Sequence, residues 1–258
     1  MVSPGLARDA WGDPFPTVSP PASALRQIPS ASMLPYRNPA MSLEVSGYDI
    51  PPRGLNEADL HALSREFPPS SPNRRNLFVF SPLVESLVKR GSFSHLAQQV
   101  LGDRAFAVRA IFFNKIEKAN WHVPWHQDIG IPIRDRRDVP GFSAFTRKDG
   151  ILHVNAPSNV LENLLILRLH LDECTATNGA VRLIPGSHLQ GRIHDHNIHP
   201  QSEAQPELPA GGILRLRPLL LHASAHSRSD SPRRVVHIEY AVDDLPGGLE
   251  WATRVYAD

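Results

Sequence analysis

The chain has 258 residues, of which 41% are hydrophobic, and we expect one large domain or a domain with a tail. Its 27 basic and 26 acidic residues give a formal charge of +1, without the basic excess of a duplex-binding protein, so nucleic acid is excluded as the main partner. The apolar runs are far shorter than the ~20 residues of a membrane span, so we expect no membrane segment. Cys174 is the single cysteine, which excludes an internal disulfide. Because the N-terminus also has no secretion-signal pattern, we expect a cytoplasmic location.

Proline is concentrated at the start of the chain, where residues 1–40 contain 8 of the 25 prolines. Proline locks φ and has no N–H to donate, so this segment can form neither a helix nor a central strand. It also has few aromatic residues and buries too little surface to offset chain entropy, so we predict a mobile tail. Extended chain laid over the domain is the alternative, and Met33 or Met41 could be the natural start. Residues 41–258 are predicted to form a single domain.

Helix signals dominate residues 41–104 of this domain. Asn56 is a predicted N-cap, and Ser81 followed by Pro82 predicts a second cap with proline in the first turn. A third helix is predicted to end at Gly102. We therefore expect this part of the chain to be mostly helical.

Beyond the helices the hydrophobic period changes to two. Short apolar runs bounded by Gly, Pro, Asn or Asp occupy residues 106–113, 163–172, 180–184, 212–221 and 234–242. Helices followed by many strands favour a mainly β sandwich or barrel, here over residues 105–245, buttressed by N-terminal helices. The long segment at about 129–162 is predicted to be a lid over the mouth of this core.

A histidine and a carboxylate stand two residues apart at His126 and Asp128, so both point to the same side of an extended strand. Such a pair is common by chance and does not by itself identify a pair of metal ligands. His222 supports it, at the predicted end of an apolar strand. Two histidines and one carboxylate form the facial triad of non-heme Fe(II) oxygenases, which leaves three metal positions open. An arginine after the second histidine would supply a fork for a carboxylate.

Four motifs carry a resemblance to a known family. They are WHQD at 125–128, NGAVRLIPGSH at 178–188, HAS at 222–224 and PRR at 232–234. In this order and spacing they resemble the phytanoyl-CoA dioxygenase family of Fe(II)- and 2-oxoglutarate-dependent oxygenases, over roughly residues 106–240. The resemblance implies a double-stranded β-helix, a cupin-like jelly roll whose open mouth holds the metal, in agreement with the strand prediction.

The resemblance also implies roles for individual residues. His126, Asp128 and His222 would bind Fe(II), while Ser224 and Arg233 would hold the distal carboxylate of 2-oxoglutarate. With O2, such an enzyme hydroxylates a small-molecule substrate and releases succinate and CO2. Related halogenases lack the carboxylate ligand, so Asp128 favours hydroxylation; desaturation, epoxidation or ring formation stay open.

Strand alternation separates Arg233 from its neighbour Arg234, because adjacent residues of a strand face opposite sides. The side of Arg234 is the more apolar and is expected to pack on helices, so we place Arg233 inside. In the strand at 163–172, four leucines share one face and Arg168 lies on the other. Arg168 would then contact 2-oxoglutarate or an acidic substrate, or else form a salt bridge inside the barrel.

Three further residues are candidates for substrate contact. His153 and Arg134 lie in the predicted lid, and Lys115 ends a strand near the mouth. Each has a plainer alternative: a locally bonded loop histidine, a solvated lysine and a solvated charge run.

Two other classes of function stay open. One is an oxygen-independent cupin-type lyase, isomerase or hydrolase that uses the same ligands with zinc, manganese or nickel. Ser224 and Arg233 argue against it, because such reactions need no dicarboxylate. The other is a catalytically silent binding protein, which the complete triad disfavours. The substrate and the oligomeric state are left open.

Overall fold

The structure is a computed structural model that describes residues 42–91, 93–116, 120–193 and 202–258. The predicted tail at 1–40 lies outside the described residues. Within them, no helix is long and apolar enough to cross a membrane. The described chain is mainly β, as predicted, with antiparallel pairing throughout its three sheets.

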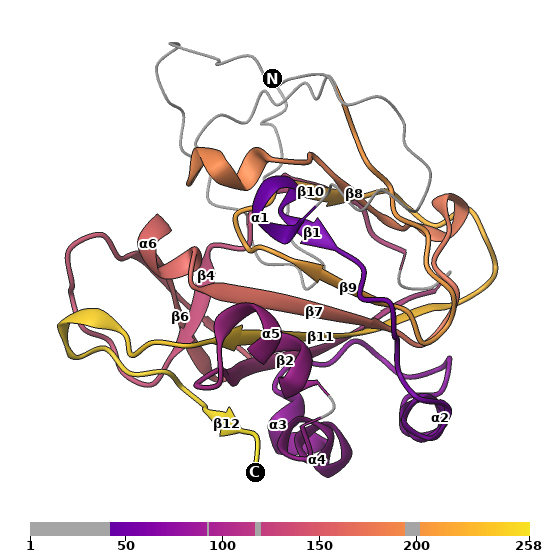
Figure 1. Cartoon of the computed structure of the whole chain (residues 1–258), viewed down its shortest axis with the longest axis horizontal. Helices are drawn as coiled ribbons and strands as arrows, with labels where there is room; N and C mark the ends of the chain where they lie inside the picture. The colour runs from indigo at the N-terminus through magenta and orange to yellow at the C-terminus, as the bar shows by residue number, and fades with distance from the viewer. Residues whose placement is uncertain (1–41, 92, 117–119, 194–201) are drawn as a thin grey trace, which may run out of the picture.

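The largest sheet has six strands in the order β1-β9-β7-β11-β2-β12. They span Tyr48–Asp49 (β1), Ile213–Leu216 (β9), Leu164–His170 (β7), Arg233–Ala241 (β11), Phe106–Lys115 (β2) and Val255–Tyr256 (β12). At its centre β11 lies between β2 and β7 (Figure 1), so segments distant in sequence meet there. A sheet of three short strands has the order β3-β10-β8, with β3 at Val123–His126, β10 at His222–Ser224 and β8 at Val181–Leu183.

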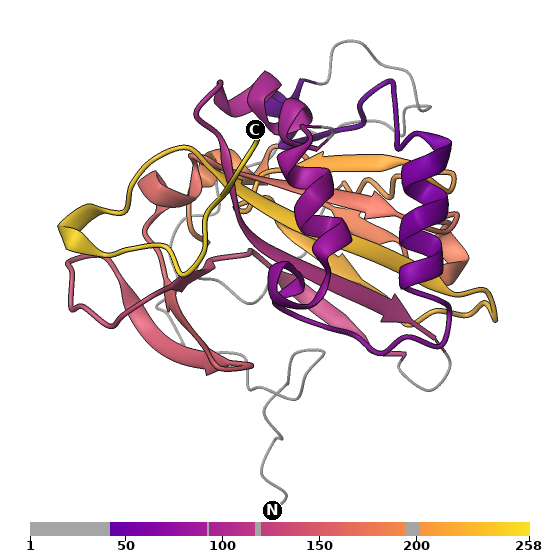
Figure 2. The same cartoon turned by 90° about the horizontal axis from the view of Figure 1, so that it is seen from below.

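Helices cover one face of the large sheet (Figure 2). The helices span Leu43–Ser46 (α1), Glu57–Glu66 (α2), Leu77–Phe80 (α3), Pro82–Lys89 (α4), Ser94–Leu101 (α5) and Ser158–Leu161 (α6), with short 3-10 turns at Ala176–Asn178, Ser187–Gln190 and Pro246–Gly248. The two predicted caps are confirmed: the side chain of Asn56 accepts the N–H of Asp59, and that of Ser81 accepts the N–H of Val84. The third predicted helix ends at Gly102, as expected.

The main core lies between these helices and the sheet. The predicted leucine face of β7 packs there beside apolar residues of β11 and β2, such as Val236 and Phe112, and against α2, α4 and α5. Each fully buried leucine contributes about 1.5–3 kcal/mol to stability through the hydrophobic effect. This packing turns the opposite face of β2, β7 and β11 toward β3 and β10.

The predicted strand at 212–221 is wrong in its second half. β9 ends at Leu216, and the chain then turns, with the N–H of Leu220 donating to the carbonyl of Arg217. Pro218 has no N–H for a strand ladder, and its carbonyl accepts the N–H of Asp128 instead. His222 therefore begins a strand of the small sheet rather than ending one of the large sheet.

The segment at 129–162 forms a third sheet with the order β4-β6-β5, followed by α6. Its strands span Gly130–Ile133 (β4), Ile151–Asn155 (β6) and Ser143–Lys148 (β5). One face of this sheet, with Ile131, Ile133 and Val154, packs against Phe106 and Trp251 of the main body. The segment is thus a sheet packed on the main body, which its length alone did not predict. That it acts as a lid stays a prediction.

Candidate metal centre

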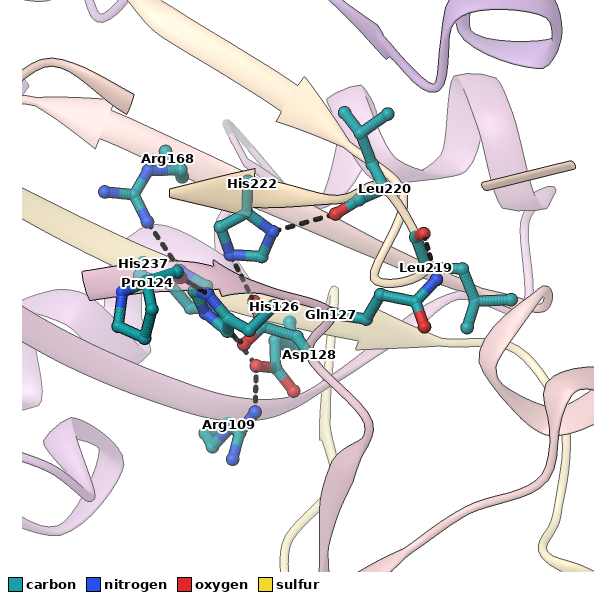
Figure 3. Close-up of polar contacts among 11 residues, drawn as sticks. Arg109, Pro124, His126, Gln127, Asp128, Arg168, Leu219, Leu220, His222 and His237 are labelled. Atoms are coloured by element: carbon teal, nitrogen blue, oxygen red, sulfur yellow. Dashed lines mark hydrogen bonds and ion pairs between the residues drawn. The ribbon is translucent and has the colours of Figure 1, made fainter. Parts of the chain in front are cut away.

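Two paired strands bring the predicted ligands together (Figure 3). His126 on β3 is the register partner of His222 on β10, and their ring centroids lie 4.1 Å apart. Asp128 follows β3, with its carboxylate oxygens 3.8 Å from Nε2 of His126 and 3.4 Å from Nε2 of His222. One ligand atom from each of the three residues lies within 4.8 Å of the others. The three side chains therefore converge on a common point, as a shared metal ion requires.

Gln127 fixes the loop between the first two ligands. Its side-chain Nε2 donates to the carbonyls of Gly191 (2.8 Å) and Leu219 (2.6 Å), and its Oε1 accepts the N–H of Ile193 (2.8 Å). These hydrogen bonds hold the Gln127 side chain on the side of the backbone away from the ligands. Its neighbours His126 and Asp128 therefore both point to the opposite side.

Both histidines are oriented by backbone carbonyls. Nδ1 of His126 donates to the carbonyl of Pro124 at 2.9 Å, and Nδ1 of His222 donates to that of Leu220 at 2.8 Å. A neutral imidazole with its proton on Nδ1 carries a lone pair on Nε2, the atom that faces Asp128 in each case. This arrangement of the outer hydrogen bonds is the usual one for metal-binding histidines.

The electrostatics agree with metal ligation. Burial and the nearby His222 lower the pKa of His126 to about 4. Burial acts to raise the pKa of Asp128, but the two neighbouring histidines, His222 first and then His126, hold it well below its usual value. His126 is thus neutral and Asp128 ionised near pH 7, which are the protonation states that a metal ion needs. The donor set fits a divalent metal held by three protein ligands with further positions open.

A cluster of three buried cations, here called the cation cluster, lies beside the triad. It consists of Lys115 on β2, Arg168 on β7 and Arg233 on β11. Nε and Nη1 of Arg233 and Nε of Arg168 are buried without a hydrogen-bond partner. In the part of the chain that the structure describes, no carboxylate bonds to any of the three. Uncompensated charges of this kind are costly to bury, so the cluster is suited to an anionic ligand.

The facing of the two adjacent arginines follows the predicted alternation. Arg233 is only 3% exposed and lies on the side of the metal centre. Arg234 points to the helix side, where it bonds to both carboxylate oxygens of Asp172 and to the carbonyl of Phe67. Arg168 lies on the inner face too, with its Nη1 3.4 Å from Nδ1 of His237, and burial next to Arg233 lowers its pKa to about 10.

Lys115 joins the cation cluster to Ser224. Its Nζ donates to Oγ of Ser224 (3.1 Å) and to the carbonyl of Ala225 (2.6 Å), and the residue is fully buried. Burial, followed by repulsion from Arg233 and Arg168, lowers the pKa of Lys115 to about 7. The expectation from sequence was substrate contact, whereas the structure places this lysine with the residues expected to bind 2-oxoglutarate.

A β-bulge in β2 decides which of its side chains face the metal centre. The register with β11 shifts between Ala107 and Arg109, which leaves Val108 as an extra residue. Ala107 and then Ala110 pack on the helix side, three residues apart instead of two. Without the extra residue, strict alternation would turn Arg109 and Lys115 toward the helices.

The other two candidates for substrate contact, His153 and Arg134, lie in different environments. His153 on β6 is buried, and its pKa is lowered to about 3 by burial and then by the charge of Arg109. Arg134 is more than half exposed and forms ion pairs with Asp135 and Glu250; no contact in the described chain connects it to the triad.

Sequence reasoning missed functional candidates on the inner face of the large sheet. These are Arg109 on β2, His170 on β7, and His237 and Glu239 on β11. Both ring nitrogens of the buried His170 lack a partner, while Glu239 bonds to Arg109 and His237. The period-two alternation that selected Arg233 also selects His237 and Glu239, so this signal was present in the sequence. Arg109 could not be found in this way, because the bulge inverts the alternation.

Comparisons with known proteins agree with this geometry. The family model described as phytanoyl-CoA dioxygenase (PhyH) matches residues 71–235, well over half of the chain. Comparison with curated protein sequences gives no significant match.

Solved structures share the fold at low sequence identity. The non-heme α-ketoglutarate-dependent epimerase SnoN from nogalamycin biosynthesis has 16% identity and a TM-score of 0.59, over 83% of this chain and 89% of its own. EctD from S. alaskensis in its apo form has 15% identity and a TM-score of 0.60, over 84% of each chain. HygX from Streptomyces hygroscopicus, with nickel and 2-oxoglutarate bound, has 14% identity and a TM-score of 0.55, over 77% of this chain and 83% of its own.

These likenesses agree with the jelly-roll fold expected from the strand pattern. The family match spans the three converging ligands at 126, 128 and 222 together with Arg233, and therefore includes the whole candidate centre. The chain belongs to the phytanoyl-CoA dioxygenase family.

Proposed function

We propose that the protein is an iron(II)- and 2-oxoglutarate-dependent oxygenase that hydroxylates a small molecule. The observation that carries the proposal is the combination of a convergent His126–Asp128–His222 triad with an adjacent cation cluster that has no carboxylate partner in the described chain. A metal ion and a dicarboxylate would satisfy both features at once.

Each residue has a defined task in this proposal. His126 and His222 would hold the metal through Nε2, and Asp128 would offset part of its charge. Arg233, with its two unpartnered nitrogens, would fork onto the distal carboxylate of 2-oxoglutarate. Lys115, already bonded to Ser224, would complete the charge compensation.

When bound, the iron centre supplies the redox chemistry that couples oxidative decarboxylation of 2-oxoglutarate to hydroxylation of the substrate, with succinate and CO2 as the other products. The contribution of the chain is to position the cosubstrate and to surround the centre with buried groups. The cation cluster would hold the far carboxylate of 2-oxoglutarate, and this would orient the keto acid end toward the metal held by the triad.

The alternative function is an oxygen-independent cupin-type lyase, isomerase or hydrolase with the same ligands. The cation cluster favours the oxygenase, because a reaction without a dicarboxylate leaves the buried charges of Arg168 and Arg233 without a carboxylate partner in the described chain. The structural neighbours include an epimerase, a carbocyclase and a monooxygenase. Hydroxylation is therefore one outcome of several for this fold, and product analysis has to establish it.

The test is titration of 2-oxoglutarate into the Fe(II)-loaded protein without oxygen, followed by visible absorption. A weak charge-transfer band is expected on addition, because a chelating keto acid and open metal positions are both required for it. Succinate formed after admission of oxygen is the second readout. Absence of the band in protein shown to hold iron would refute the oxygenase and support the oxygen-independent alternative.

A further inference from the structure

A second polar cluster adjoins the triad and takes no part in the roles assigned above. It consists of Arg109 on β2, His153 on β6, and His237 and Glu239 on β11, and it is called here the neutral cluster. Glu239 is 2% exposed, and His153 and His237 are each 4% exposed. The cluster lies where the third sheet meets the inner face of the large sheet.

Hydrogen bonds run through this cluster in one direction. Nη1 of Arg168 donates to Nδ1 of His237 (3.4 Å), so Nε2 of His237 carries the proton and donates to Oε1 of Glu239 (3.0 Å). Nη2 of Arg109 forms an ion pair with the same Oε1. Both donors thus fall on one oxygen of the Glu239 carboxylate.

Other polar atoms of Arg109, Glu239 and His153 form no hydrogen bond with described residues. In the described part of the chain, Oε2 of Glu239 accepts no hydrogen bond, and Nε of Arg109 is buried without a partner. Nδ1 of His153 donates to the carbonyl of Ile151 (3.1 Å), which leaves Nε2 as an acceptor. A purely structural ion pair at this burial is expected to be saturated, because each unsatisfied polar atom costs about 1–3 kcal/mol. Nε of Arg109 bears this cost, and with the free acceptors beside it indicates a ligand.

The cluster is close enough to the metal centre to contact a substrate bound there. Figure 3 draws Arg109, His237 and Asp128 in one close-up of the site. The charge of Asp128 acts on both His237 and Glu239, and the charges of Arg109 and Glu239 act on His153. One ligand group could therefore contact the neutral cluster while the rest of the molecule faces the triad.

The charge balance selects the kind of ligand. Glu239 is ionised, since attraction from Arg109 and the hydrogen bond from His237 outweigh the opposing effect of burial and lower its pKa. Arg109 cancels this charge, and His153 and His237 are neutral because burial lowers the pKa of each. The cluster carries no net charge, in contrast to the cation cluster beside it.

On the basis of the proposed function, we propose that Arg109 and Glu239 form the substrate-recognition site, which takes a group of no net charge that presents an acceptor to Arg109 and a donor to Glu239. A zwitterionic amino acid head group or a neutral amide meets this requirement. An isolated carboxylate or phosphate would leave Glu239 facing a like charge, and an isolated ammonium would face Arg109.

The test uses series of related probes that share a side chain and differ in the charge of the head group. Glycine, leucine and phenylalanine are each compared with the amide (cationic), the N-acetyl derivative (anionic) and the N-acetyl amide (neutral). Binding is measured by calorimetry on the protein loaded with Fe(II) and 2-oxoglutarate without oxygen. For the wild type we expect the net-neutral members of at least one series to bind at least tenfold more tightly than the charged members.

Two variants should invert this preference in opposite directions. Glu239→Gln leaves the charge of Arg109 uncompensated, so anionic probes should now bind most tightly. Arg109→Met leaves Glu239 uncompensated and should favour the cationic probes. Loss of folding alone would weaken all probes alike and cannot produce opposite selectivities.

The outcomes separate this inference from the proposed function. If the wild type shows no band with 2-oxoglutarate, the proposed function fails. If the band forms but no probe binds, or the charge preference is the same in wild type and both variants, the recognition site is wrong while the oxygenase stands. Opposite inversions in the two variants would support the assignment of Arg109 and Glu239.

Discussion

We expect Lys115 to make the binding of 2-oxoglutarate depend on pH. Its amine is buried beside Arg233 and Arg168, which lowers its pKa to about 7, whereas a carboxylate placed next to it would favour the charged form. The protonated lysine attracts 2-oxoglutarate and the neutral lysine does not, so affinity should be greatest below pH 7 and should fall as the pH rises above it.

The magnitude follows from linkage. If the bound carboxylate restores the pKa of Lys115 to its ordinary value of about 10.4, binding takes up nearly one proton above pH 7. The dissociation constant of 2-oxoglutarate should then rise by roughly 50-fold between pH 7 and pH 9, equivalent to about 2.3 kcal/mol. Arg233 stays protonated over this range and contributes no slope.

The assay is anaerobic titration of 2-oxoglutarate into the Fe(II) protein at a series of pH values. Calorimetry in buffers of different ionisation enthalpy counts the protons taken up. Lys115→Met is the matched variant, because it keeps an unbranched chain in the buried position and removes the titrating group. Its affinity should be weaker at pH 7 and nearly flat to pH 9. An equal slope in wild type and Lys115→Met, or no proton uptake by the wild type, would refute the reasoning.

Four further substitutions test the site and the fold. Asp128→Ala should abolish iron retention, measured by metal analysis after desalting, because two histidines alone leave the metal charge without an anionic ligand; full retention would contradict the triad. Arg233→Leu should raise the 2-oxoglutarate KM by about 30-fold or more, as expected for loss of one partner of a buried charge pair. Arg234→Leu should instead lower the free energy of unfolding by about 3–5 kcal/mol, because it strands the Asp172 carboxylate; a KM effect confined to Arg234→Leu would show that the assigned facing is reversed. Ser81→Ala should cost about 1 kcal/mol in denaturant unfolding through loss of the α4 cap, and an unchanged midpoint would contradict the role of that cap.

The triad is surrounded by two clusters of different charge. The cation cluster carries positive charge without an acidic partner in the described chain, while Arg109 and Glu239 cancel in the neutral cluster. A dicarboxylate and a net-neutral substrate group are thus expected on different sides of one metal. The two binding experiments therefore have independent readouts. The charge preference among the probes depends on Glu239, whereas the pH dependence of 2-oxoglutarate binding depends on Lys115.

The sequence by itself determined the features that depend on neighbouring residues. The caps at Asn56 and Ser81 are local hydrogen bonds, so they can be predicted from a few letters. The alternation that placed Arg233 inside and Arg234 outside depends only on the two-residue period of a strand. The candidate metal ligands followed from motif order and spacing, and the family from the same motifs.

Only the tertiary structure decided where these local elements meet. The bulge at Val108 turns Lys115 and Arg109 inward, and it exists only in the pairing of β2 with β11. The turn after Leu216 depends on Pro218, whose carbonyl accepts the N–H of Asp128. The sheet at 129–162 is stabilised by apolar contacts with distant residues that no local period reveals. Bulges, crossings between sheets and shared cores are interactions between distant segments, and their energies are absent from any short stretch of sequence.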